Sequence, residues 1–262
     1  MKVKGVLWDM DGTLLDTEKL SDEAMILAIR DLFENCECPT LDDFDWPIKK
    51  RIIGTRSADW VPIIENWVMT LSKGTATKRE GVSLVDRWEH HLQDLCSGDK
   101  LSAIDGAAEM VEFFASHNIP QAIATSSSQD LVANKCTNET MKGLFFNKMK
   151  DIITGDMVSN GKPAPDMYLL AASRIEVSPA DCIVFEDSAP GCISGRAAKA
   201  GKVFALPDPR YSGEERAELF SGNCDFIFRS SWSELVQNFQ FHHNGEALLM
   251  TVNENEMVRA PF

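Results

Sequence analysis

The chain has 262 residues, of which 44% are hydrophobic and 25% charged, a composition that excludes a wholly disordered protein and provides for a sizeable core. It carries 26 lysines and arginines against 40 aspartates and glutamates, which gives a formal net charge of −14. Such an acidic surface repels phosphate backbones and anionic lipids, so we expect neither nucleic acid nor a membrane as a partner. No apolar run reaches the ~18 residues that a membrane span needs, and we expect a cytoplasmic monomer.

The first predicted element is a strand over residues 3–8, an apolar run rich in β-forming residues. It ends at Asp9 and Asp11, two carboxylates two positions apart, and Gly12 follows them. Side chains two positions apart in an extended chain point to the same side, where the like charges of this pair repel each other. A shared divalent cation relieves that repulsion, and a site of oxygen ligands suits Mg²⁺. The sequence therefore predicts a magnesium site at the end of this strand.

The same pattern is compatible with two other structures. Asp-x-Asp-Gly also opens a calcium-binding loop, but that loop needs a glycine at its sixth position and an acid at its twelfth. This chain has Leu14 and Leu20 at those positions, which argues against calcium. A solvated acidic turn without a function is the second alternative.

Residues 17–96 are predicted to form a helical insertion between the first strand and the rest of the sheet. The segment is far longer than an ordinary crossover connection, and apolar residues recur in it at helical spacing. We therefore predict a core domain over residues 1–16 and 97–240 and a helical cap domain over 17–96, with the tryptophans of the cap packed in its core. Three amphipathic helices are marked by Met25, Ile29 and Leu32, by Trp60, Ile64, Trp67 and Leu71, and by Val82, Val85, Trp88, Leu92 and Leu95.

Strand and helix patterns alternate in the second half of the chain. Short β-rich runs at 121–125, 151–154, 182–185 and 202–206 are separated by amphipathic helical segments. This alternation is typical of a parallel sheet with helices on its faces, so we predict an α/β fold with a Rossmann-like core. Periodicity is lost over 241–262, where we predict a flexible C-terminal tail.

Polar residues follow two of these strands. In open α/β sheets ligands bind beyond the carboxyl ends of the strands, and Thr125 stands at that point, followed by Ser126 and Ser127. Their hydroxyls and turn amides would hold phosphate oxygens, although the same residues would equally cap the helix that follows. Glu186 and Asp187 end the run at 182–185 and form a second carboxylate pair.

Lys162 lies in a loop with prolines at 163 and 165, just before a predicted helix. The prolines stiffen this loop and hold the charge of the lysine at one place. A single surface lysine is usually solvated. Because four acids and a hydroxyl are predicted at the same edge of the sheet, we expect Lys162 to belong to the site.

These segments resemble the four motifs of the haloacid dehalogenase superfamily, and the helical insertion is similar to the small cap of that family. The likeness extends to its pseudouridine-5'-phosphatase-like and beta-phosphoglucomutase-like members and covers about residues 3–206. It implies a Mg²⁺-dependent phosphatase that hydrolyses a small phosphorylated metabolite: a sugar, polyol or nucleoside phosphate. The motifs are Asp9-Met10-Asp11-Gly12-Thr13, Thr125, Lys162-Pro163-Ala164-Pro165-Asp166 and Glu186-Asp187.

The resemblance also implies a role for each motif residue. Asp9 would attack phosphorus and form an aspartyl-phosphate, and Asp11 would act first as general acid and then as general base. Lys162 and Thr125 would hold the phosphoryl oxygens. The implied ligands of Mg²⁺ are Asp9, the backbone carbonyl of Asp11, Asp187 and, through water, Glu186.

Substrate choice is expected to lie in the cap, because the predicted core site reads only phosphate. Thr55 and Arg56 fall where similar proteins turn a loop toward the core. The planar guanidinium of Arg56 would pair with a substrate oxygen or phosphate, or Arg56 would be a solvated residue at a helix start.

Two other activities remain as alternatives. A phosphomutase uses the same motifs, but similar mutases carry a histidine where this chain has Ser21, which favours hydrolysis. A non-enzymatic receiver domain also uses an acidic Mg²⁺ pocket with a hydroxyl and a lysine. Receivers have no cap and no counterpart of Asp11.

Overall fold

The chain divides into two compact units, the second of which is inserted into the first. The computed structural model describes residues 2–53, 57–228, 231–234, 239–243 and 248–252. One unit, here called the core unit, comprises Met1–Asp16 and Ser102–Phe262, and the other, the inserted unit, comprises Thr17–Leu101. The core unit resumes at residue 102 and not at the predicted residue 97, because residues 98–101 only connect the last helix of the inserted unit to a strand of the core unit.

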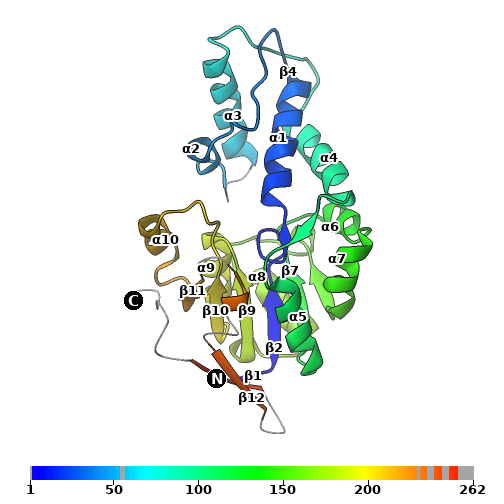
Figure 1. Ribbon diagram of the computed structural model, residues 1–262, viewed down its shortest axis with the longest axis vertical. Helices are drawn as coiled ribbons and strands as arrows, with labels where there is room; N and C mark the ends of the chain where they lie inside the picture. Colours follow the sequence, from blue (N-terminus) through cyan, green and yellow to red (C-terminus); the bar gives the residue numbers. More distant parts are fainter. Residues whose placement is uncertain (1, 54–56, 229–230, 235–238, 244–247, 253–262) are drawn as a thin grey trace. The chain divides into compact units, whose positions relative to one another are not determined.

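In the described part of the core unit, a parallel six-stranded sheet forms the centre (Figure 1). The five predicted strands are present. The sheet also has a sixth strand, β11, at its edge, which was not predicted because two residues are too few to show a periodicity. This sheet confirms the predicted α/β fold. Its strands are, in order across the sheet, β11 (Phe226–Ile227), β10 (Lys202–Ala205), β9 (Cys182–Glu186), β2 (Gly5–Trp8), β7 (Gln121–Ala124) and β8 (Asp151–Ile153).

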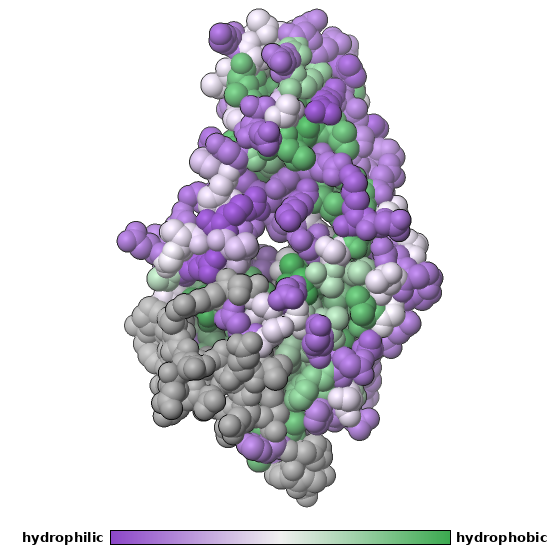
Figure 2. All heavy atoms as spheres, in the orientation of Figure 1, coloured by the Kyte–Doolittle hydropathy of each residue, from purple (hydrophilic) through white to green (hydrophobic). Residues whose placement is uncertain are grey.

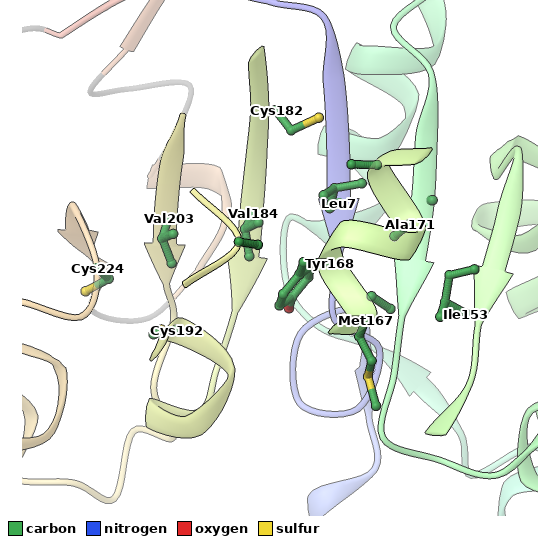
Figure 3. Close-up of a cluster of buried hydrophobic side chains, with 14 of the residues drawn as sticks. Leu7, Ile153, Met167, Tyr168, Ala171, Cys182, Val184, Cys192, Val203 and Cys224 are labelled. Atoms are coloured by element: carbon green, nitrogen blue, oxygen red, sulfur yellow. The ribbon is translucent and has the colours of Figure 1, made fainter. Parts of the chain in front are cut away.

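Alternate residues of the strands face opposite layers of helices. On one face, Leu7 of β2, Val184 of β9 and Val203 of β10 lie in a cluster of buried side chains with residues of α8 (Asp166–Arg174) and α9 (Ala189–Ala197), as Figure 3 shows. Every strand in the middle of this sheet is covered on both sides. That is why these strands read as continuous apolar runs.

The other face is aromatic. Trp8 stacks on Phe185 with ring centroids 4.1 Å apart, and Phe114 of α5 (Ala107–Ser116) meets the edge of Trp8 at 6.2 Å. The indole N–H of Trp8 donates to the side-chain oxygen of Gln121 at 2.9 Å, so its polar atom is satisfied within the core. This layer fixes the backbone of β2 directly before Asp9.

Short helices connect the remaining strands of the core unit. Ser128 accepts a hydrogen bond from the backbone amide of Leu131 and so caps α6, and Ser212 and Glu215 form a capping box on α10. These helices and the single 3-10 turns are α6 (Gln129–Lys135), α7 (Glu139–Leu144), η1 (Phe146–Lys148), η2 (Gly155–Met157), η3 (Pro179–Asp181) and α10 (Gly213–Phe220).

The inserted unit is helical, as predicted. Its described elements are α1 (Glu18–Leu32), β4 (Phe33–Glu34), α2 (Trp46–Lys49), α3 (Ser57–Leu71), β5 (Thr77–Lys78) and α4 (Leu84–Ser97). Trp60 is 9% exposed and packs edge to face against Trp88, with ring centroids 6.0 Å apart. These two tryptophans therefore pack within the bundle.

The chain is paired with itself where it leaves and re-enters the core unit. The strand β3 (Leu15–Asp16) pairs antiparallel with β6 (Ser102–Ala103). The two ends of the insertion are thus held together by a two-residue ladder.

The prediction of a flexible tail is wrong for part of residues 241–262. Strands β12 (Phe239–His243) and β13 (Leu248–Val252) form a hairpin, and β13 pairs antiparallel with β1 (Lys2–Val3). This pairing joins the two ends of the chain, so a search for local periodicity does not find it. Residues 253–262 lie outside the described part.

Hydrophilic residues dominate the surface of the face drawn in Figure 2, with smaller apolar areas between them. Of the helices that the structure describes, none has the length and apolar character to cross a bilayer.

Candidate active site

The carboxyl ends of β2, β7 and β9 bring the predicted polar residues together. These strands are neighbours and run parallel, so their last residues meet at one edge of the sheet. Asp9 follows β2, Thr125 follows β7 and Glu186 is the last residue of β9. All three side chains belong to buried residues, with exposures of 7%, 1% and 0%.

Lys162 joins two of these carboxylates. Its Nζ lies 2.6 Å from Asp9 Oδ1 and 2.6 Å from Glu186 Oε1, and its side chain is 6% exposed. Burial raises the pKa of Asp9 to about 7, against the opposing effect of Lys162. Burial alone would lower the pKa of the Lys162 ammonium, but the two carboxylates hold it above its ordinary value. The predicted position of Lys162 in the cluster is therefore what the structure shows.

Glu186 accepts hydrogen bonds on both of its carboxylate oxygens. Its carboxylate accepts five hydrogen bonds, from Lys162, the Tyr168 hydroxyl, the backbone amides of Asp187 and Ser188, and the Ser188 hydroxyl. The hydroxyl of Tyr168 donates at 2.7 Å, and burial, with Glu186 beside it, raises the pKa of that phenol well above its ordinary range. Glu186 is thus a fixed anchor for Lys162.

The loop after β9 leaves no room for a side chain at Gly191, in the first turn of α9. A Cβ there would lie 1.7 Å from Glu186 Oε1. Ser188 accepts a hydrogen bond from the Gly191 amide and caps the helix. The close approach explains a glycine at this position.

We expect Gly191→Ala to lower the free energy of unfolding by about 1–3 kcal/mol, because the methyl group must displace a buried, fully hydrogen-bonded carboxylate. Urea unfolding measures the change. Gly143→Ala is the matched control: nothing lies within 4 Å of a Cβ at Gly143 in α7, so alanine should stabilise that helix by about 0.5–1 kcal/mol. Equal midpoints for Gly191→Ala and the wild type would contradict the close contact.

Three acids could hold a metal ion. Asp9, Glu186 and Asp187 each offer a carboxylate oxygen, and these atoms lie within 4.8 Å of one another. Gly12 permits the approach of Asp187: it has a φ of +82°, and a Cβ there would lie 2.3 Å from Asp187 Oδ2. Hard oxygen donors gathered in this way are the ligands that Mg²⁺ prefers. The donor set therefore fits a magnesium ion.

The carboxylate of Asp11 points to a different group of residues. Its Oδ1 lies 2.5 Å from Nζ of Lys135, and its Oδ2 accepts a hydrogen bond from the Ser127 hydroxyl at 2.7 Å and a longer one from Thr125 at 3.5 Å. The amide of Ser127 donates to Thr125 Oγ1 at 3.1 Å, which ties the loop to the threonine. Ser126, the third predicted residue of this loop, is exposed.

The sequence did not reveal Tyr168 or Lys135. Both lie on buried faces of helices, where most side chains are apolar. A polar group on such a face needs a partner, and that is the signal by which they could have been found. Thr55 and Arg56, the predicted cap residues, lie outside the described residues.

Comparison with known proteins shows the family of this chain. The model of the haloacid dehalogenase-like hydrolase family matches residues 3–199, which confirms the resemblance drawn from the four motifs. The bifunctional riboflavin kinase/FMN phosphatase of Arabidopsis thaliana is 31% identical over 77% of this chain, which spans only about half (48%) of that protein. The probable pseudouridine-5'-phosphatase of Drosophila melanogaster is 28% identical, with 86% of this chain and 92% of that protein covered.

A solved structure is also similar. It is that of a provisionally assigned beta-phosphoglucomutase from Thermotoga maritima, with a TM-score of 0.66 and 25% sequence identity. The match covers 87% of this chain and 94% of the other.

Proposed function

Because this chain belongs to the haloacid dehalogenase-like hydrolases, we propose that it is a Mg²⁺-dependent phosphatase that hydrolyses a small phosphomonoester through an aspartyl-phosphate on Asp9. One observation supports this most strongly: Asp9 is buried at a strand end, with Lys162 2.6 Å away and Thr125 at the end of the neighbouring strand. Two relatives are named as an FMN phosphatase and a probable pseudouridine-5'-phosphatase, which supports a small phosphomonoester as the substrate. The proposed substrate class is a sugar, polyol or nucleoside phosphate.

In the first half-reaction, a carboxylate oxygen of Asp9 attacks phosphorus. The bond from phosphorus to the leaving oxygen breaks, and Asp11 gives its proton to that oxygen. Lys162 and Thr125 hold phosphoryl oxygens, so positive charge and a hydroxyl are already in place where charge spreads in the transition state. Glu186 keeps the Lys162 ammonium at its position.

In the second half-reaction, water hydrolyses the aspartyl-phosphate. Asp11, now ionised, takes a proton from the water as its oxygen attacks phosphorus. The bond between phosphorus and Asp9 breaks, inorganic phosphate leaves, and both carboxyl groups return to their starting state.

Asp9, Asp187 and the backbone carbonyl of Asp11 would bind the Mg²⁺ directly. Glu186 would contribute through water, because both of its carboxylate oxygens already accept hydrogen bonds. When bound, the ion neutralises charge on the transferred group.

We expect EDTA to abolish activity and Mg²⁺ to restore it. Because burial raises the pKa of Asp9 to about 7, the ion must displace a proton below that pH. The affinity for Mg²⁺ should therefore fall as pH drops below about 7, by up to about tenfold per unit, and level off above it. Titration calorimetry in two buffers of different ionisation enthalpy counts the released proton. Full activity in EDTA, or an affinity that does not change between pH 5.5 and 8, would contradict this site.

The test of the proposed function is inorganic phosphate release, with Mg²⁺, from FMN, pseudouridine 5'-phosphate, uridine 5'-monophosphate, ribose 5-phosphate, glycerol 3-phosphate and glucose 1-phosphate. Hydrolysis of at least one alkyl phosphate is the expected result. Isomerisation of glucose 1-phosphate to glucose 6-phosphate without phosphate release would instead assign a mutase. If neither reaction occurs with any of these compounds, the proposal is wrong.

A further inference from the structure

Lys135 is a buried lysine that no motif of the sequence accounts for. It is the last residue of α6, its side chain is 1% exposed, and it shares the buried face of that helix with Leu131 and Val132. An apolar residue would complete this face without removing a charge from water. Burial of an ammonium group is unfavourable unless a partner compensates it, so the lysine requires an explanation.

Its partner is the proposed general acid and base. Lys135 Nζ lies 2.5 Å from Asp11 Oδ1 and 3.4 Å from the Ser127 hydroxyl, and that hydroxyl donates to Asp11 Oδ2 at 2.7 Å. The ammonium and the hydroxyl thus hold the two oxygens of one carboxylate. The Asp11 side chain is 27% exposed, so solvent reaches it, while the side chain of Lys135 is buried.

The two buried lysines of the site serve different carboxylates. Lys162 lies between Asp9 and Glu186, whereas Lys135 contacts Asp11 from α6, the helix that follows β7. Lys162 therefore cannot stand in for Lys135 in orienting Asp11.

We propose that Lys135 is a positioning residue for the reaction: together with Ser127 it fixes the carboxyl group of Asp11, so that proton transfer to the leaving oxygen, and later from the attacking water, starts from one orientation. The inference rests on the proposed function, since it acts through Asp11. It adds a residue outside the four motifs to the groups that the reaction needs. Lys135 itself does not touch the substrate.

The variant that tests this role is Lys135→Met, which keeps the length of the stem and suits the apolar face. Removing the charge leaves Asp11 able to contact water, so the melting temperature should stay the same or rise. We expect kcat for the best alkyl phosphate of the panel to fall at least tenfold, with KM within threefold of the wild type. A purely structural ion pair would give the opposite result, a lower melting temperature with kcat preserved.

A double-mutant cycle with Asp11→Asn gives the second readout. If Lys135 acts through Asp11, then Lys135→Met should add less than a twofold loss of kcat in the Asp11→Asn background. kcat/KM for p-nitrophenyl phosphate, whose leaving group needs no proton, should fall less than kcat/KM for the alkyl phosphate. The matched control is Lys142→Met: Lys142 is a half-exposed lysine on α7, and its replacement should leave kcat and KM unchanged. The kcat of Lys135→Gln, which keeps a hydrogen-bond donor, should lie between those of the wild type and Lys135→Met. This variant replaces Lys135→Met in the test if the methionine variant does not fold.

Wild-type kcat in Lys135→Met, or equal losses in the two backgrounds, would overturn the inference and leave the phosphatase proposal intact. A loss of kcat that follows a lower melting temperature would overturn it as well. If the wild-type protein releases phosphate from no member of the panel, the proposed function fails and the inference fails with it.

Discussion

Asp9→Asn should lower kcat by at least about 10³-fold while substrate binding is kept, because the amide has the shape of the carboxylate but is not a nucleophile. The measurement combines phosphate release with acid trapping of protein that has taken up labelled phosphate from the substrate. Wild-type protein quenched in acid during turnover should carry phosphate that hydroxylamine removes, and the variant should carry none.

The control for this substitution is Asp130→Asn. Asp130 is an exposed aspartate in the first turn of α6, in the same unit of the chain. It should keep kcat within about twofold and retain the trapped label. If Asp9→Asn turned over nearly as fast as the wild type, covalent catalysis by Asp9 would be refuted.

Lys162→Met should cost both activity and stability. The substitution leaves the carboxylates of Asp9 and Glu186 buried without their shared cation, and breaking a buried pair of this kind costs about 3–5 kcal/mol. We also expect kcat to fall at least about 10²-fold, because a donor to the transferred phosphoryl group is lost. Urea unfolding and phosphate release measure the two effects.

Magnesium makes this prediction sharper. Since Mg²⁺ would partly replace the missing positive charge, it should raise the melting temperature of Lys162→Met more than that of the wild type. Lys150→Met, at a half-exposed surface ion pair with Glu176, should change stability by no more than about 1 kcal/mol and should not alter the response to Mg²⁺. A Lys162→Met variant as stable as the wild type would show that the two contacts of Lys162 contribute little.

Much of the site could be predicted because it lies at strand ends. Asp9, Thr125 and Glu186 each directly follow or end an apolar run, and parallel strands bring such positions to one edge whatever their separation in sequence. The helices of the inserted unit were equally accessible, since repeats such as Trp60 and Ile64 mark their buried side. In both cases a local pattern carries the information.

The parts that were missed depend on contacts between distant residues. The sequence shows that a lysine at position 135 interrupts an apolar face, but its partner Asp11 is 124 positions away and no periodicity links the two. Tyr168 likewise meets Glu186 only through the packing of α8 on the sheet. Strand β13 pairs with the other end of the chain, so its residues were interpreted as a tail.

The short ladder between β3 and β6 allows the inserted unit to change without a change in the core unit. Because residues 15–16 pair with residues 102–103, the inserted unit is, for the core unit, a single loop whose two ends are held at fixed positions. The entropic cost of closing such a loop grows only with the logarithm of its length. A chain with this core unit can therefore lengthen, shorten or replace the inserted unit, and with it the substrate choice that we expect of that unit, while β2 and Asp9 keep their place.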